Sequence, residues 1–388
     1  MKMNICELCS SISETYKDNA KKVVLINTSD VYDGKCTNHT VVDNKNLKGQ
    51  FKKTFKPNDI LYSEIRPANR RFAYIDFDTK DYIASTKLMV IRANKGVNPK
   101  YLYQILRSDI TINKLQMLAE SRSGTFPQIT FSELSNIEID VPSADKQDLI
   151  VTILSSLDAK IETNNKFNEK LEEMAQTIFK SWFVDFEPFK DKPFHETELG
   201  MIPEGWEVGS LSDIATITMG QSPCGTSYNE NGEGIIFYQG RTEFGFRFPS
   251  IRLYTTAPSR FAEVGSTLMS VRAPVGDINM SLLRCCIGRG VASIKSNCDC
   301  DSYIYYLMKS LKKRFDIYNG EGTVFGSVGR DTLRGMLITI PPSSVISDFE
   351  MNISKIDSRI KTNELESQRL ASLRDTLLPR LMSGELIV

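Results

Sequence analysis

The chain has 388 residues, of which 41% are hydrophobic and 25% are charged, and its formal net charge is zero. This length is sufficient for two or three domains with cores of their own, and the composition is that of an ordinary soluble protein. The charge balance excludes a simple polycation. No run of eighteen apolar residues and no signal-peptide core is present, so we expect a cytoplasmic protein.

The cysteines and histidines do not form a recognised metal motif. Cys6 and Cys9 make the one C-x-x-C among eight cysteines, and neither a second such pair nor a histidine pair stands at zinc spacing. His39 and His195 lack metal partners at any recognised spacing. We therefore predict reduced structural thiols and no metal site.

Residues 1–141 are rich in strand and turn signals. Residues 80–94, KDYIASTKLMVIRAN, form a β-branched run, and residues 135–142, SNIEIDVP, alternate between polar and apolar positions. Residues 101–121, YLYQILRSDITINKLQMLAES, predict a short amphipathic helix. These patterns indicate a mixed α/β domain.

Residues 144–183 predict one long helix of roughly 60 Å, since an α-helix rises about 1.5 Å per residue. One row of apolar residues recurs every seven positions and a second row lies four positions after it: Ile150, Leu157, Leu171 and Ile178, then Leu154, Ile161, Ala175 and Trp182. Two such rows form the seam of a coiled coil. Asn164 takes the place in the first row where an apolar residue is missing.

The same pattern occurs again 199 residues later. The correspondence covers the seam and its flanks: Pro142 with Pro341, Leu157 with Ile356, Asp158 with Asp357, Ile161 with Ile360, Asn164 with Asn363, Leu171 with Leu370 and Ile178 with Leu377. Because an apolar seam needs a partner, we predict that the two helices pair and that Asn164 and Asn363 fix their register. The alternative is two unrelated amphipathic helices, each lying on its own domain.

The segments before the two helices also repeat. At an offset of 202, Tyr101, Tyr103, Ile105, Arg107 and Ser108 match Tyr303, Tyr305, Leu307, Lys309 and Ser310, and at 207, Leu61, Ser63 and Pro67 match Leu268, Ser270 and Pro274. The drift in offset indicates loops of different length on a shared frame. We divide the chain into a first domain at 1–141, a helix with its linker at 142–190, a second domain at 191–341 and a second helix at 342–388.

Charge is distributed unevenly between these parts. Residues 50–122 hold fourteen Lys and Arg against seven acids, and residues 239–334 hold fourteen against eight. The helical segments have the opposite balance, with six basic and nine acidic residues in 144–190 and six and seven in 345–388. This pattern is typical of globular parts that meet phosphate and helices that meet protein, although a solvated basic face is the alternative.

Three strings resemble one protein family. LGMIPEGWEVGSLSDIATITMGQSP opens the second domain, IFKSWFVDFEPF closes the first helix, and LRDTLLPRLMSGEL closes the chain. Together they resemble the DNA specificity subunit of type I restriction-modification systems, whose order of domain, helix, domain and helix matches this chain. The first domain departs from the pattern because it starts at MKMNICELCSSISETYK and lacks the L-G-x-I-P-x-G-W opening.

The resemblance implies an α+β fold. Two mixed α/β target recognition domains would be separated by two long helices that pair as an antiparallel coiled coil, giving a pseudo-twofold internal repeat. Each domain would read one half of a split site on double-stranded DNA, and the helices would set the gap between the halves. The chain would dock two modification subunits, which methylate adenine, and restriction subunits. It would bind no cofactor itself, with S-adenosylmethionine on the modification subunits and ATP and Mg on the restriction subunits.

Other classes of protein fit the residues less well. An adenine methyltransferase needs an N/D-P-P-F/Y motif, and the nearest string, residues 185–189, has the wrong spacing at a helix end. Asp185, Glu187 and Lys190 have the spacing of a nuclease motif, but at a predicted helix end a solvated linker is the alternative interpretation. A coiled-coil scaffold that does not bind DNA explains the helices but leaves the two basic domains unexplained.

Candidate DNA contacts are polar and basic residues in turn-like stretches, because such side chains read base edges and hold phosphates. In the first domain they are Arg66, Asn69, Arg70, Arg71, Lys87, Arg122, Ser123, Thr125 and Gln128. In the second domain they are Tyr228, Gln239, Arg241, Arg272, Arg289, Thr323 and Arg330. A structural ion pair is the alternative for each.

Overall fold

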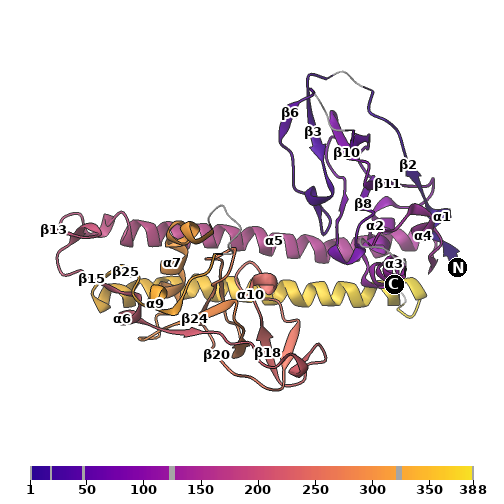
Figure 1. Ribbon diagram of the computed structural model, residues 1–388. Coiled ribbons are helices and arrows are strands. Elements are labelled where there is room, and N and C mark those ends of the chain that lie inside the picture. Colours follow the sequence, from indigo (N-terminus) through magenta and orange to yellow (C-terminus); the bar gives the residue numbers. More distant parts are fainter. Residues whose placement is uncertain (1, 18–19, 46–48, 122–126, 320–325, 387–388) are drawn as a thin grey trace. The chain divides into compact units, whose positions relative to one another are not determined.

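Two helices of 40 and 41 residues, α5 (Ala144–Phe183) and α10 (Ser343–Ser383), are the longest elements of the chain (Figure 1). The structure is a computed structural model that describes residues 2–17, 20–45, 49–121, 127–319 and 326–386. Both predicted long helices are confirmed. The chain forms two compact units, unit 1 from Met1–Glu162 with Glu366–Val388 and unit 2 from Thr163–Leu365. Each long helix contributes a part to each unit. The units therefore divide the chain differently from the predicted domains, whose boundaries stay a prediction.

Unit 1 holds two four-stranded sheets and four short helices. The antiparallel sheet has the order β2 (Cys9–Ile12), β11 (Leu88–Ala93), β8 (Ile60–Ser63) and β9 (Phe72–Tyr74). The mixed sheet has the order β6 (Val41–Asp43), β3 (Lys22–Ile26), β10 (Tyr82–Ser85) and β7 (Phe51–Lys53), with β3 and β10 parallel. The remaining elements are β1 (Lys2–Asn4) paired with β12 (Glu138–Asp140), β4 (Val31–Tyr32) paired with β5 (Lys35–Cys36), α1 (Ile5–Leu8), α2 (Pro99–Arg107), α3 (Asp109–Glu120), α4 (Phe131–Ser135), and the 3-10 turns η1 (Thr28–Asp30) and η2 (Pro67–Asn69).

Unit 2 repeats this frame. Its antiparallel sheet has the order β16 (Ala215–Met219), β24 (Val291–Ser296), β21 (Thr267–Ser270) and β22 (Ile278–Met280). Its mixed sheet has the order β17 (Tyr228–Asn229), β19 (Leu253–Thr255), β18 (Ile235–Tyr238), β23 (Cys285–Ile287) and β20 (Phe261–Ala262), with β18 and β23 parallel. The remaining elements are β15 (Glu207–Ser210) paired with β25 (Leu337–Ile340), β13 (Phe194–Thr197) paired with β14 (Gly200–Pro203), α6 (Leu211–Ile214), α7 (Asp301–Ser310), α8 (Lys312–Asp316), α9 (Arg330–Arg334), and the 3-10 turns η3 (Glu187–Phe189), η4 (Gly225–Ser227), η5 (Arg241–Glu243) and η6 (Ile317–Asn319).

The predicted internal repeat is therefore confirmed in the antiparallel sheets and the strand pairs beside them, including at the start of the first domain, where the sequence match is weakest, while the mixed sheets have four and five strands. β1 pairs with β12 as β15 pairs with β25, and β2 lies beside β11 as β16 lies beside β24. The prediction of a single helix over 101–121 is wrong, because the chain turns at Ser108. Ser108 has an extended backbone (φ −64°, ψ 144°), and its hydroxyl accepts a hydrogen bond from the Thr111 nitrogen at the start of α3.

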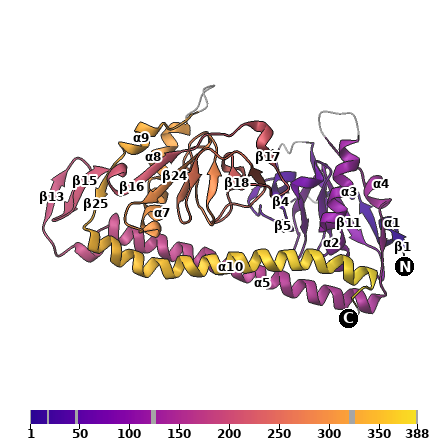
Figure 2. The same ribbon diagram turned by 90° about the horizontal axis from the view of Figure 1, so that it is seen from below.

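Each long helix is amphipathic because it packs into the cores of the two units. In unit 1, Ile150 and Leu154 of α5 join α2 and the end of α10 in one apolar cluster. In unit 2, Phe183 of α5 lies 5.0 Å from the rings of both Phe349 and Tyr303, and α7 lies between the β24 sheet and the long helices (Figure 2). Within the described parts of the chain, none of the helices has the length and apolar character of a membrane span.

The two helices run antiparallel within each unit. In unit 1 Asp158 of α5 pairs with Arg374 of α10, and in unit 2 Asn164 lies against Asn363. The Asn164 amide approaches the Asn363 backbone carbonyl at 3.5 Å, whereas the Asn363 amide donates to the Asn168 side chain at 2.7 Å. The polar layer in the seam thus consists of three asparagines, of which the sequence indicated two.

The buried stripe departs from the predicted seam. Of the predicted apolar seam, the buried residues are Ile150, Leu154, Ala175 and Ile360, whereas the half-buried ones are Leu157, Ile161, Leu171, Ile178, Trp182, Ile356, Leu370 and Leu377. Glu172 and Phe179 are buried instead, next to the predicted positions 171 and 178. The reason is that each helix packs against a globular core as well as its partner helix, so the buried face is turned toward that core.

Arg247 joins the globular part of unit 2 to both long helices. Its side chain is fully buried, with 0% of the residue exposed, and its guanidinium pairs with Glu172 of α5 and with Asp357 of α10, the latter at 2.8 Å. Tyr306 of α7 accepts from the same guanidinium at 2.6 Å, and Lys309 of α7 also pairs with Glu172. Burial alone favours the neutral acid, but Arg247 and Lys309 outweigh it and lower the pKa of Glu172 to about 2. We call these five residues the Arg247 cluster.

Unit 1 has a matching set of contacts around Asp158. This carboxylate accepts from Gln104 at 3.1 Å and from Arg107 at 2.8 Å, both on α2, and from Arg374 of α10 at 2.7 Å. Although burial opposes ionisation, Arg107 and Arg374 lower the pKa of Asp158. The globular part of each unit is therefore fixed to the long helices by buried ionic contacts.

We predict that Arg247→Met destabilises the chain by about 3 to 5 kcal/mol, because two buried carboxylates then lose their shared cation. Unfolding in urea measures the change. The matched control is Lys190→Met, which removes one charge from an exposed pair with Glu187 and should cost at most about 1 kcal/mol. Equal losses in the two variants would contradict the assigned role of Arg247.

Glu364 predicts a pH dependence of stability. It accepts from the Arg247 backbone nitrogen at 3.1 Å, and burial raises its pKa to about 7. A carboxyl whose pKa is higher in the folded state favours folding while it is protonated, so this contribution is full below the unfolded pKa of about 4.3 and is lost as the pH rises through 7. Glu364→Gln keeps the accepting oxygen but does not ionise. The free energy of unfolding of the variant, relative to that of the unsubstituted chain, should rise by roughly 2 to 3 kcal/mol as the pH is raised from 4 to 8. Urea unfolding measures this difference, and a difference that does not change with pH would refute the assignment.

Candidate nucleic-acid interface

Several loops of unit 2 meet around the turn at residues 288–290, between β23 and β24. The Gly288 nitrogen donates to the Tyr238 carbonyl at 2.8 Å, and the Gly290 nitrogen donates to the Gln239 carbonyl at 3.2 Å. The Gln221 nitrogen donates to the Ile287 carbonyl at 2.9 Å. Residues 259–260 and 271–272 adjoin the same turn, since Ile287 donates to the Arg260 carbonyl at 2.9 Å and Val271 to the Gly290 carbonyl at 3.0 Å. We call residues 220–222, 239–240, 259–260, 271–272 and 288–290 the loop corner.

Glycines allow the loops of this corner to approach closely. A side-chain carbon at Gly220 would lie 2.2 Å from the Gly288 carbonyl oxygen, and one at Gly290 would lie 2.8 Å from the Gln239 oxygen. One at Gly288 would lie 3.0 Å from the Gln239 Cα atom. The backbones of three segments are thus in direct contact, and their positions are fixed by hydrogen bonds rather than by side chains.

Five polar side chains of the loop corner are exposed, and none forms a side-chain hydrogen bond or ion pair with any residue that the structure describes: Gln221, Gln239, Arg260, Arg272 and Arg289. Gln239, Arg272 and Arg289 were predicted from the sequence, and the structure brings them together. Gln221 and Arg260 were missed. The glycine in MGQSP was an available signal for Gln221, which follows Gly220 directly, whereas Arg260 in PSRF has no such neighbour.

Other predicted residues of unit 2 have structural partners. Arg241 pairs with Asp277, which Lys312 also contacts at 3.1 Å. Tyr228 donates to the Pro223 carbonyl at 3.0 Å, and its ring lies 4.8 Å from that of Phe237. Arg330 is exposed at the start of α9, and Thr323 lies outside the described residues.

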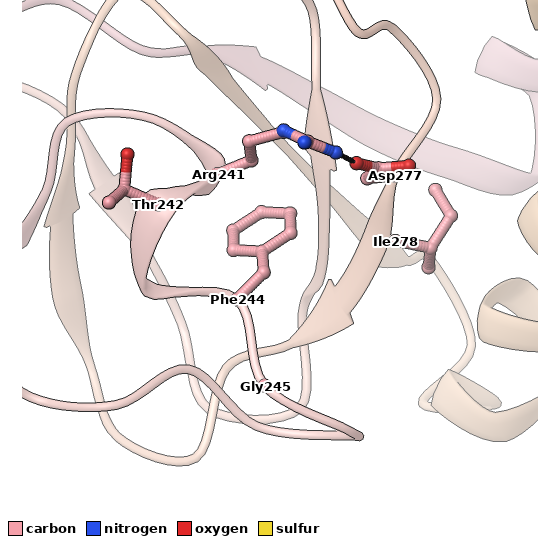
Figure 3. Close-up of a pocket in the computed structure, with 6 residues that line it drawn as sticks. All are labelled: Arg241, Thr242, Phe244, Gly245, Asp277 and Ile278. Atoms are coloured by element: carbon pink, nitrogen blue, oxygen red, sulfur yellow. Dashed lines mark hydrogen bonds and ion pairs between the residues drawn. The ribbon is translucent and has the colours of Figure 1, made fainter. Parts of the chain in front are cut away.

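A cavity of about 580 Å³ lies beside the Arg241–Asp277 pair (Figure 3). Its lining consists of Arg241, Thr242, Phe244, Gly245, Asp277 and Ile278. The Phe244 ring lies beneath the Arg241 side chain, whose guanidinium reaches across to Asp277. Two cations therefore contact the one carboxylate of this cavity. Over the described ranges, no group of three or more His, Cys, Asp or Glu side chains is arranged to hold a metal ion.

The equivalent corner of unit 1 surrounds residues 85–87, between β10 and β11. The Glu64 nitrogen donates to the Lys87 carbonyl at 3.1 Å, as Val271 donates to Gly290 in unit 2. The Lys87 ammonium lies 3.4 Å from the Gln128 side-chain oxygen and 3.8 Å from a Glu64 oxygen. Arg66 lies beside them, because its backbone nitrogen donates to the Pro127 carbonyl at 3.1 Å, and its side chain is exposed. Among the predicted residues, the structure brings Arg66, Lys87 and Gln128 together.

Two other predicted arginines of unit 1 have structural partners. Arg70 pairs with Asp33 at 2.9 Å and with Asp109 at 2.8 Å, and Arg71 donates to the Ser29 carbonyl at 2.8 Å. Asn69 is exposed at the end of η2. Arg122, Ser123 and Thr125 lie outside the described residues.

Comparison with known proteins gives a consistent result. The family described as type I restriction modification DNA specificity domain matches residues 4–173 and again residues 203–374. The chain is 30% identical over 460 aligned positions to the type I restriction enzyme HindI specificity subunit of Haemophilus influenzae, and the match covers 98% of both chains. It is 30% identical over 311 positions to the MjaIX specificity subunit of Methanocaldococcus jannaschii, covering 76% of this chain and 70% of the relative.

A solved structure shares the fold. The crystal structure of the type I restriction-modification system S subunit from M. genitalium has a TM-score of 0.52 with this chain, at 15% identity. The superposition covers 98% of this chain and 95% of the other. At that identity the likeness concerns the fold alone.

The close packing of the loop corner predicts a position-specific effect of adding one methyl group. We expect Gly220→Ala to destabilise the chain by about 1 to 3 kcal/mol, because the new carbon collides with the Gly288 carbonyl. Gly225→Ala in the same loop is the matched control, since a side-chain carbon there meets no atom within 4 Å, and it should change stability by less than about 0.5 kcal/mol. Urea unfolding of both variants measures the difference, and similar stabilities would show that the corner is not tightly packed.

Proposed function

Because the chain belongs to the family of type I restriction modification DNA specificity domains, we propose that it selects the DNA sequence on which a type I restriction-modification enzyme acts. One repeat reads each half of a split site. The observation that carries this proposal is the repeated frame, in which the same corner of each unit presents polar and basic side chains. Two similar frames with different loop residues suit two half-sites with different bases.

Electrostatics supports contact with DNA through the globular parts. Arg260, Arg272 and Arg289 of the loop corner are exposed and have no carboxylate partner among the described residues. A phosphate backbone attracts such unpaired cations strongly at low salt, because each contact releases condensed counterions. The acidic balance of the helical segments does not favour DNA there, so we assign protein partners to the helices.

We further propose that the chain performs no chemistry itself. It docks two modification subunits, which carry S-adenosylmethionine and methylate adenine, and restriction subunits, which carry ATP and Mg. The sequence supports this division of labour because it lacks the N/D-P-P-F/Y motif of adenine methyltransferases.

A chimera tests the proposal. Residues 200–340 are replaced by the matching segment of a family member with another specificity, and the chimera is expressed with its modification subunits. We expect adenine methylation at sites in which one half has changed and the other half is retained, because each repeat has its own core and its own corner. Sequencing of methylated DNA gives the result, and the chain without modification subunits serves as the control that methylates nothing. A change in both halves together would contradict the assignment of one repeat to each half.

A further inference from the structure

The loop corner contains a smaller set of side chains that are suited to reading bases. Gln221, Gln239 and Arg289 each stand on a segment whose backbone is held by its neighbours, through the hydrogen bonds of Gln221 to Ile287 and of Gly290 to Gln239. All three side chains are exposed and have no partner among the described residues. A rigid backbone under a free side chain reduces the conformational entropy that is lost on binding.

We propose that Gln221, Gln239 and Arg289 are the base-reading residues of unit 2 and that they recognise purine edges in duplex DNA. A glutamine amide donates to and accepts from adenine at N7 and N6, and an arginine guanidinium donates twice to guanine at O6 and N7. The half-site of unit 2 therefore contains adenine and guanine at the positions that these side chains reach. This inference rests on the proposed function and adds to it the residues and the kind of base.

Two neighbouring arginines have a different role. Arg260 and Arg272 flank the 288–290 turn, since the Arg260 carbonyl accepts from Ile287 and Val271 donates to Gly290. Cations beside a reading edge suit phosphate, whose contacts position the protein without reading sequence. Arg272 is therefore assigned to the DNA backbone.

Two other exposed arginines of this domain differ from the reading set because their side chains have carboxylate partners. Arg252 pairs with Glu243 at 2.5 Å, and Arg284 pairs with Glu263 at 3.0 Å. Arg284 also stacks on the Phe261 ring at 4.1 Å. These side chains already have partners and give matched controls of the same residue type and similar exposure.

The test uses the full chain assembled with its modification subunits. The recognised site is first selected from randomised duplexes with the unsubstituted chain. Binding is then measured for Gln221→Ala, Gln239→Ala, Arg289→Ala, Arg272→Ala and Arg284→Ala, on the recognised duplex and on duplexes with one base pair changed in the half-site of unit 2. We expect each reading variant to lose about tenfold or more in affinity for the recognised duplex and to lose discrimination at one purine position. Arg272→Ala should weaken all duplexes alike with a shallower salt dependence, and Arg284→Ala should behave as the unsubstituted chain.

The outcomes separate this inference from the function on which it rests. If the unsubstituted complex prefers no duplex, the proposed function itself fails. If the complex is selective and the three reading variants keep its discrimination, or weaken all duplexes alike, the function stands and the assignment of these residues is overturned. Because the substituted side chains are exposed, urea unfolding should show stabilities close to that of the unsubstituted chain.

Discussion

A single buried guanidinium, that of Arg247, holds the recognition domain of unit 2 in place on both long helices. Removing this charge from water is costly, and the cost is offset only where Glu172, Asp357 and Tyr306 all reach it. A shift of α5 against α10, or of the domain against either helix, leaves at least one buried charge without its partner. Apolar packing tolerates small sliding, whereas this ionic contact does not, so the Arg247 cluster sets the orientation in which the loop corner is presented.

In both repeats a carboxylate of a long helix fixes the domain to the helices, but the residues that pair with it differ. Asp158 and Asp357 occupy equivalent helix positions, and each accepts from the helix that follows the antiparallel sheet, through Gln104 and Arg107 of α2 or through Tyr306 of α7. The balancing cation differs. In unit 1 the carboxylate pairs with Arg107 of α2 and with Arg374 of the partner helix, and in unit 2 it pairs with Arg247 from a loop of the domain. A carboxylate shared by both copies thus fixes the docking geometry, while the source of the countercharge is free to change.

Sequence periodicity predicted the helices, their pairing and the repeat, because each depends on spacing along the chain. It failed where contacts join distant residues. Asn168 and Glu172 are buried although neither stands in the two predicted apolar rows, because their partners come from the other long helix and from the domain. Arg70 and Arg241 were predicted as DNA contacts because each stands in a turn, with a structural ion pair as the alternative, and spacing along the chain did not reveal their carboxylate partners 37 and 36 residues away. In unit 2 the structure groups the predicted residues Gln239, Arg272 and Arg289, whose side chains have no partner among the described residues. In unit 1 it groups Arg66, Lys87 and Gln128.

The comparison of the two corners explains how recognition can change while the fold is kept. The backbone bond from Glu64 to Lys87 in unit 1 corresponds to the bond from Val271 to Gly290 in unit 2, at 3.1 and 3.0 Å. At the positions that these bonds fix, unit 1 has Lys87 beside a carboxylate and an amide, and unit 2 has a glycine beside Arg289. The bonds involve only backbone atoms, so an exchange of the exposed side chains outside the close-packed glycines would alter the donors and acceptors of the proposed DNA-facing corner without altering the frame. Under the proposed assignment, new specificity arises from substitutions at exposed non-glycine positions of the corner, where their cost in stability is small, and not in the cores or in the buried ionic contacts.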